Sequence, residues 1–107
     1  MKYAVLLAAA LSLPAQAGMI DGNYLLEQMQ NKLTAAQIFS SGYIAGVHDS
    51  TSNVLFCSPS EVTLGQLSSM VKKHLVDNPS TRHLGADIII TGMLNNIWPC
   101  AKKGRAL

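Results

Sequence analysis

The side chains that could do chemistry in this sequence are two cysteines, Cys57 and Cys100, and the adjacent pair His48 and Asp49. A cysteine nucleophile needs an imidazole to take its proton and a carboxylate to orient the imidazole. Side chains one position apart do not face each other on a helix, so we expect that His48 and Asp49 cannot serve one nucleophile together. The sequence therefore predicts no catalytic residue and no enzyme.

Other reactive sites are not indicated either. The three histidines, His48, His74 and His83, match no zinc-binding spacing. The six acidic residues stand singly along the chain, so no two lie close in sequence as a carboxylate pair for glycoside hydrolysis. A phosphate-binding glycine loop, a nucleophile elbow and a zincin motif are all missing. We expect no metal and no cofactor.

Residues 1–17 have the organisation of a secretory signal peptide. Lys2 gives the positive start, Tyr3–Leu13 the apolar middle, and Pro14 breaks the helix before the small residues of Ala15–Ala17. The apolar middle is shorter than the roughly 20 residues needed to cross a bilayer. We therefore predict cleavage after Ala17 and a mature protein that has no membrane segment.

The mature chain, residues 18–107, is predicted to be one small domain. In the oxidising compartment reached by export, two thiols form a disulfide more readily than a redox or metal site. A Cys57–Cys100 bond contributes roughly 4 kcal/mol in the chain-entropy model. This is comparable to the whole net stability of a domain of this size. The disulfide is therefore predicted to be structural.

The charge balance argues against nucleic acid as a partner. Eight lysines and arginines face six acidic residues, and no basic stripe with interleaved aromatic residues is present. Lys102, Lys103 and Arg105 are interpreted as a solvated chain end.

Capping signals divide the chain into helices. Asn23 is the expected N-cap of the first helix, and Thr34 with Gln37 forms a predicted capping box for a second helix that ends near His48. Gly42 and Gly46 share one face of this second helix, which suggests that another helix packs closely there.

The chain after His48 is expected to leave the helix. Residues 48–53 are polar and predict a loop, and Val54–Phe56 predicts a short extended piece that enters the core. Thr63 and Gln66 form a second capping box before a helix with an apolar stripe. That stripe is made by Leu64, Leu67, Val71 and Leu75.

Asn78–Pro79 ends the third helix and can begin the next, since proline is well tolerated at a first helical position. The last segment, residues 85–92, is compatible with a buried strand or with a helix. We favour a helix, because a lone strand would have no partner, and Pro99 would end it. The predicted fold is all-α: four helices, or four to five, joined by one disulfide. The aromatic residues Tyr43, Phe56 and Trp98 are expected in the core.

Six short blocks of the chain stand in a characteristic order: Asn23–Leu26, Gly42–Asp49, Phe56–Pro59, Val62–Leu67, Asn78–His83 and Trp98–Cys100. Together they resemble the Rap/Tai family of immunity proteins, which accompany peptidoglycan-amidase effectors of bacterial type VI secretion systems. Many members carry a second cysteine pair, but Met29, Ser40 and Ser41 stand in the corresponding helices here. The resemblance therefore leaves one possible disulfide.

The resemblance implies a periplasmic all-α protein, often a homodimer, that occludes the cleft of a papain-like amidase without catalysis. Its affinity should come from a few buried anchors inside a polar rim. Two regions could fill the cleft: the expected loop or the exposed face of the third helix. The loop candidates are His48, Asp49, Ser50, Thr51, Ser52 and Asn53, and the helix candidates are Gln66, Ser69, Lys72 and Lys73.

Two other functions stay open at this stage. The first is a periplasmic module that binds a small apolar ligand or lipid, for which the five methionines would give an adaptable pocket. The second is a cell-wall hydrolase that uses Cys57, against which the missing motifs argue.

Overall fold

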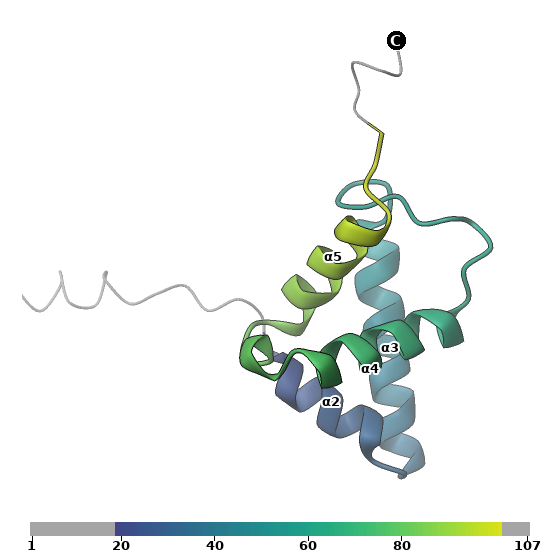
Figure 1. Cartoon of the computed structure of the whole chain (residues 1–107). Helices are drawn as coiled ribbons and strands as arrows, with labels where there is room; N and C mark the ends of the chain where they lie inside the picture. Colours follow the sequence, from purple (N-terminus) through teal and green to yellow (C-terminus); the bar gives the residue numbers. More distant parts are fainter. Residues whose placement is uncertain (1–18, 102–107) are drawn as a thin grey trace, which may run out of the picture.

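The computed structural model describes residues 19–101 and consists of four α-helices in this range (Figure 1). The predicted all-α class and the Cys57–Cys100 disulfide are confirmed. The predicted signal peptide, its cleavage site and the basic residues from Lys102 onward lie outside the described residues. The helices are α2 (Gly22–Gln30), α3 (Thr34–Thr51), α4 (Leu64–Asp77) and α5 (Ala86–Ile97), with a 3₁₀ turn η1 (Pro79–Thr81) before α5.

The helices enclose a single core. Helix α4 crosses the long helix α3, with α2 and α5 packed around the crossing (Figure 1). In the described part of the chain, no helix is long and apolar enough to cross a membrane. The core side chains are Leu25, Leu26, Ile44, Phe56, Leu67, Val71, Leu75, Ala86, Ile89, Ile90, Met93 and Leu94.

Helix α2 begins at a different residue from the one expected. Asp21, not Asn23, is the N-cap, and its Oδ1 accepts a hydrogen bond from the Tyr24 amide at 2.8 Å. The Asn23 amide instead donates to the Arg82 carbonyl at 2.9 Å. The chain just before α5 thus supplies acceptors for the first turn of α2.

The close approach of two segments occurs at Gly22, and not at Gly42 and Gly46. A Cβ atom on Gly22 would lie 2.7 Å from Ile89 Cδ1 and 2.8 Å from the Arg82 carbonyl oxygen. No atom outside the local helix lies within 4 Å of a Cβ built on Gly42 or Gly46. The predicted tight packing of a second helix on these two glycines is therefore wrong within this chain.

Helix α3 also departs from its prediction at both ends. Its N-cap is Leu33, and the Thr34–Gln37 capping box does not form; the Gln37 side chain donates to the Met29 carbonyl at 3.1 Å instead. The helix continues to Thr51, past the expected end at His48. The Thr51 hydroxyl donates to the Val47 carbonyl at 2.5 Å, and the Ser52 amide donates to the His48 carbonyl at the end of the helix.

Helices α4 and α5 follow their predictions closely. The capping box is present, because the Gln66 amide donates to Thr63 Oγ1 at 3.1 Å and the Thr63 amide donates to Gln66 Oε1 at 2.8 Å. Leu67, Val71 and Leu75 are buried, although Leu64 stays exposed. Pro79 begins η1, and the β-branched segment after Gly85 is helical as favoured.

The predicted extended piece at Val54–Phe56 is only partly correct. Phe56 is fully buried, whereas Val54 is 75% exposed and Leu55 is 47% exposed. The amides of Val54 and Leu55 both donate to the Thr51 carbonyl, so the chain turns back directly after α3. Of the other expected core aromatics, Tyr43 and Trp98 are half-buried against the core.

Candidate functional site

The longest connection between helices, residues 52–62, forms the centre of the candidate site; we call it the disulfide segment. Its backbone turns sharply at Asn53, whose φ of 67° lies in the left-handed region that asparagine tolerates better than most residues. The turn leaves the side chains of Asn53, Val54 and Leu55 exposed. They form the tip of the segment.

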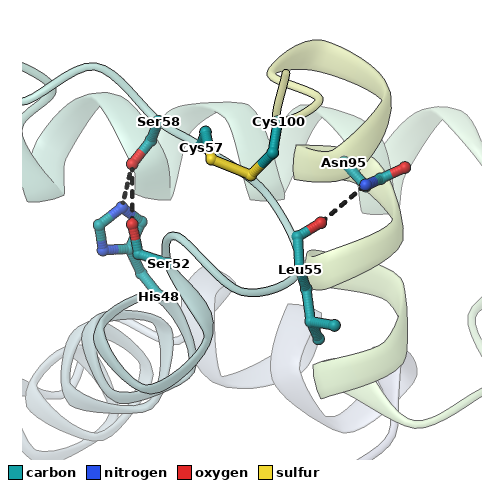
Figure 2. The surroundings of a disulfide bond; sticks show 7 residues. All are labelled: His48, Ser52, Leu55, Cys57, Ser58, Asn95 and Cys100. Atoms are coloured by element: carbon teal, nitrogen blue, oxygen red, sulfur yellow. Dashed lines mark hydrogen bonds between the residues drawn. A yellow bond between two sulfur atoms is a disulfide. The ribbon is translucent and has the colours of Figure 1, made fainter. Parts of the chain in front are cut away.

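Covalent and polar bonds tie this segment to α5. Cys57 is joined to Cys100 with a Cα–Cα distance of 4.8 Å, and its amide donates to the Trp98 carbonyl at 2.8 Å. The Asn95 side chain donates to the Leu55 carbonyl at 2.7 Å (Figure 2). Together with the burial of Phe56, these contacts hold the exposed tip on a rigid base.

A polar network ties the same segment to the end of α3. His48 Nε2 lies 2.8 Å from Ser58 Oγ, and His48 Nδ1 lies 2.9 Å from Asp49 Oδ1. Ser52 Oγ is 3.5 Å from Ser58 Oγ (Figure 2). The expectation that adjacent side chains could not meet is therefore wrong: Ser58 holds one edge of the imidazole, and Asp49 reaches the nitrogen on the other edge.

The residues predicted as a contact loop divide between two environments. His48, Asp49, Ser50 and Thr51 belong to the last turn of α3, so the predicted loop is mostly helix. The Ser52 amide donates to the His48 carbonyl and closes the last turn, while the hydroxyls of Ser50 and Thr51 donate to the Val47 carbonyl. Asp49, Ser50 and Asn53 are exposed, whereas the remaining three, His48, Thr51 and Ser52, are half-buried.

The second predicted contact set lies along the exposed side of α4, where Gln66, Ser69, Lys72 and Lys73 all reach solvent. Lys73 Nζ donates to Asp77 Oδ2 at 2.8 Å, and this hydrogen bond, with the charge of Asp77, raises the pKa of Lys73. Only Gln66 and Ser69 lie beside the disulfide segment, because Lys72 and Lys73 are further along the helix.

A groove of about 700 Å³ joins that part of α4 to the disulfide segment. We call it the α4 groove. The apolar side chains of this groove were not predicted from the sequence. Trp98 was a usable signal, because it stands two residues before Cys100 and the predicted disulfide brings it close to Pro59. Its lining comprises Pro59, Glu61, Val62, Thr63, Gly65, Gln66, Ser69, Met70 and Trp98.

A second groove, of about 530 Å³, lies between α3 and α5; we call it the α3/α5 groove. Gly42, Gly46 and Leu55 are among its lining residues. Tyr43 also lines it, and partial burial, followed by the negative charge of Asp87, raises the pKa of this tyrosine above 10.0. An aromatic row continues from this groove, with ring centroids 6.2 Å apart for Tyr43 and Phe39 and 5.8 Å for Phe39 and Tyr24.

Metal ligation finds no support in the geometry. Across residues 19–101, no three histidine, cysteine or acidic side chains gather where they could hold an ion. Cys57 and Cys100 are oxidised to each other, so neither thiol is available as a nucleophile or ligand.

A family model described as Rap1a immunity proteins matches residues 21–100, which include the disulfide segment and both grooves. No curated protein matches the chain.

Proposed function

Because this chain belongs to the Rap1a immunity protein family, as its sequence blocks predicted, we propose that it protects its producing cell from a peptidoglycan amidase delivered by type VI secretion. An immunity protein acts by binding its cognate effector. The predicted export signal and the disulfide support action in the periplasm, where thiols are oxidised. Inhibition by binding requires no catalytic residue.

The observation that carries this proposal is the exposed tip of the disulfide segment on its rigid base. The tip presents Val54 and Leu55 with Asn53 beside them, and Phe56 is fully buried directly below. A preorganised protrusion loses little conformational freedom on binding, which favours affinity. Two apolar anchors with polar neighbours match the usual pattern of an interface centre and rim. The tip would fill the narrow substrate cleft of a papain-like amidase.

The α4 groove supports a second contact with the same effector. Gln66 and Ser69 line its edge, and Met70 and Trp98 give it apolar walls. In this arrangement the tip enters the cleft while an effector side chain occupies the groove. Lys72 and Lys73 lie beyond the groove and would contact only the rim, where charged residues contribute little affinity.

The homodimer implied by the resemblance would use the outer face of α3. Phe39 and Tyr43 lie on this face and continue the aromatic row to Tyr24 of α2, and Ile38 of α3 is 68% exposed. Gly42 and Gly46 have open space above them, so a second copy could approach the α3 backbone there. Light scattering tests this interface: we expect the unchanged protein to be a dimer and the Phe39→Glu variant to be a monomer.

A binding module for a small apolar ligand is the second candidate, and the α4 groove is the observation that favours it. Its volume of about 700 Å³ is in the range of small-molecule sites. Native mass spectrometry of protein purified from the periplasm distinguishes the two functions. A lipid that remains bound, together with no affinity for the amidase, would favour the ligand-binding module.

The direct test uses the protein encoded by the neighbouring gene, which we expect to be a secreted peptidoglycan amidase. We expect the two proteins to bind at nanomolar Kd in calorimetry, and expression of the immunity protein to rescue cells that export the amidase. Leu55→Asp should weaken binding at least 100-fold. Val76→Asp is the matched control, because Val76 is also 47% exposed but lies on α4 outside both grooves. Absence of binding by the unchanged protein would refute the proposed function.

A further inference from the structure

The hydrogen-bond network around His48 has one consistent direction when the imidazole is neutral and the Asp49 carboxylate is ionised. The Asp49 carboxylate can only accept hydrogen bonds, so the proton between these two side chains belongs to His48 Nδ1. A neutral imidazole then has its lone pair on Nε2. This nitrogen lies 2.8 Å from Ser58 Oγ, so the Ser58 hydroxyl donates to it. Asp49, His48 and Ser58 thus form a relay in which the serine faces a base.

The separations in this relay suit nucleophilic catalysis. A serine activated by histidine needs hydrogen bonds of about 2.6–3.2 Å from nucleophile to base and from base to orienting group. The distances here are 2.8 Å and 2.9 Å. The imidazole is 16% exposed and its ring centroid is 5.4 Å from that of the buried Phe56. The base is therefore held in place and shielded on one side.

Stabilisation of the oxyanion is the weaker part of this arrangement. The residue after a nucleophilic serine commonly supplies an amide donor, but here it is Pro59, which has no N–H. The Ser52 hydroxyl, 3.5 Å from Ser58 Oγ, is a nearby donor that can rotate toward the developing charge. A single hydroxyl predicts slow reaction with ordinary esters and measurable reaction with activated ones.

The surroundings define the acyl group that would fit. Ser58 is half-buried, and its position is fixed by the disulfide of the preceding residue, Cys57. The next residue, Pro59, lines the α4 groove together with Met70 and Trp98. Ser58 itself is not among the lining residues, and its Oγ is directed toward His48 (Figure 2), so an acyl chain on Ser58 would reach this groove only by passing Pro59.

We propose that Ser58 is an activated nucleophile that is acylated by small activated esters with short apolar acyl groups. Ser58 Oγ bonds to the carbonyl carbon while its proton passes to His48 Nε2. The bond to the leaving oxygen then breaks, and Nε2 returns the proton to that oxygen. Water next attacks the acyl-serine, gives its proton to Nε2 and releases the carboxylic acid, and the same proton restores the Ser58 hydroxyl. Asp49 is a positioning residue.

This proposal does not depend on effector binding and is tested without an effector. The probe is an alkyl fluorophosphonate: Ser58 Oγ bonds to phosphorus, fluoride leaves and His48 takes the proton. We expect intact-mass spectrometry to show one adduct and peptide mapping to place it on Ser58. Hydrolysis of p-nitrophenyl butyrate should show a burst of one nitrophenolate per chain, followed by slow turnover.

Variants distinguish a serine that His48 activates from one that the probe labels only because it is exposed. His48→Gln should slow labelling about 10²–10⁴-fold, the range for loss of a general base. Asp49→Asn should slow it by a smaller factor at an unchanged melting temperature, which distinguishes positioning of the imidazole from loss of fold. Ser58→Ala should abolish the adduct, and Ser60→Ala, an exposed serine on the same segment, should not. Absence of the Ser58 adduct, or equal labelling of correctly folded His48→Gln, would overturn the proposal.

Discussion

Two regions are held in place in different ways. One is the junction between α2 and the chain before α5, and the other is the disulfide segment. At the junction, Gly22 lets the first turn of α2 lie against the chain before α5, with its amide 3.0 Å from the Leu84 carbonyl. In the disulfide segment only Phe56 is fully buried, and a disulfide joins the segment to Cys100, three residues after α5. Packing fixes the first region throughout, whereas a few anchors fix the second and leave its tip free to bind.

The substitution expected to have the largest effect on the disulfide segment is at Phe56. Replacement by Ala removes the one fully buried side chain that the disulfide segment contributes to the core, and a buried Phe→Ala change costs about 3–5 kcal/mol. We expect a loss of this size in urea unfolding of Phe56→Ala. A loss below about 1 kcal/mol would mean that the segment is held by its polar and covalent bonds alone.

Removal of the disulfide should separate the two regions. We expect Cys57→Ser with Cys100→Ser to lower the free energy of unfolding by roughly 2–5 kcal/mol, because the unfolded chain gains freedom. Hydrogen exchange should accelerate first in residues 52–62, while the amides of α2 and α5 at the junction keep their relative protection. Uniform acceleration across the domain would show that the two regions are not independent.

Glycine substitutions test the packed region against an open surface. Gly22→Ala should destabilise by about 1–3 kcal/mol, since the added methyl group meets Ile89 and a backbone carbonyl that cannot yield easily. Gly92→Ala on α5 is the matched control: it meets open space and lies outside the proposed dimer face, so alanine should stabilise the helix by up to about 1 kcal/mol. Thermal melts of the two variants should therefore move in opposite directions.

The smallest expected effect is at Tyr43, beside the disulfide segment. Its pKa is raised by burial and by Asp87, so the folded state favours the protonated phenol. The unfolded state then loses its proton first as the pH rises through 10.0, and stability should decline above that pH. Tyr43→Phe should reduce this decline in melting curves measured between neutral and alkaline pH. An identical alkaline decline in both proteins would contradict the assignment.

Local signals in the sequence were sufficient where neighbouring residues complete each other's bonds. The Thr63–Gln66 capping box and the start of η1 at Pro79 needed no distant partner, and both were predicted correctly. Asn23 and Thr34 carried equally good local signals, but those predictions were wrong. The Asn23 amide donates instead to the Arg82 carbonyl, which is distant in the sequence. The Gln37 side chain donates to the carbonyls of Met29 and Asn31.

The site was predictable only in part for the same reason. The disulfide followed from composition and context, but the Ser58–His48 contact joins the end of α3 to a segment that turns back on it. Sequence spacing contains no information on that turn, because it depends on the left-handed backbone at Asn53 and on the burial of Phe56. The lining of the α4 groove was not predicted either: the disulfide indicated that Trp98 lies near Pro59, but the approach of Met70 and Ser69 of α4 depends on the tertiary packing.

The sequence by itself determined the all-α class, the pairing of the two cysteines and the family, because helix periodicity, composition and ordered motifs are properties of the chain. Only the tertiary structure decided which glycine is sterically required, where α3 ends and which polar side chains meet. Those outcomes depend on contacts between residues far apart along the chain. Such contacts form only when burial of the core brings the elements together.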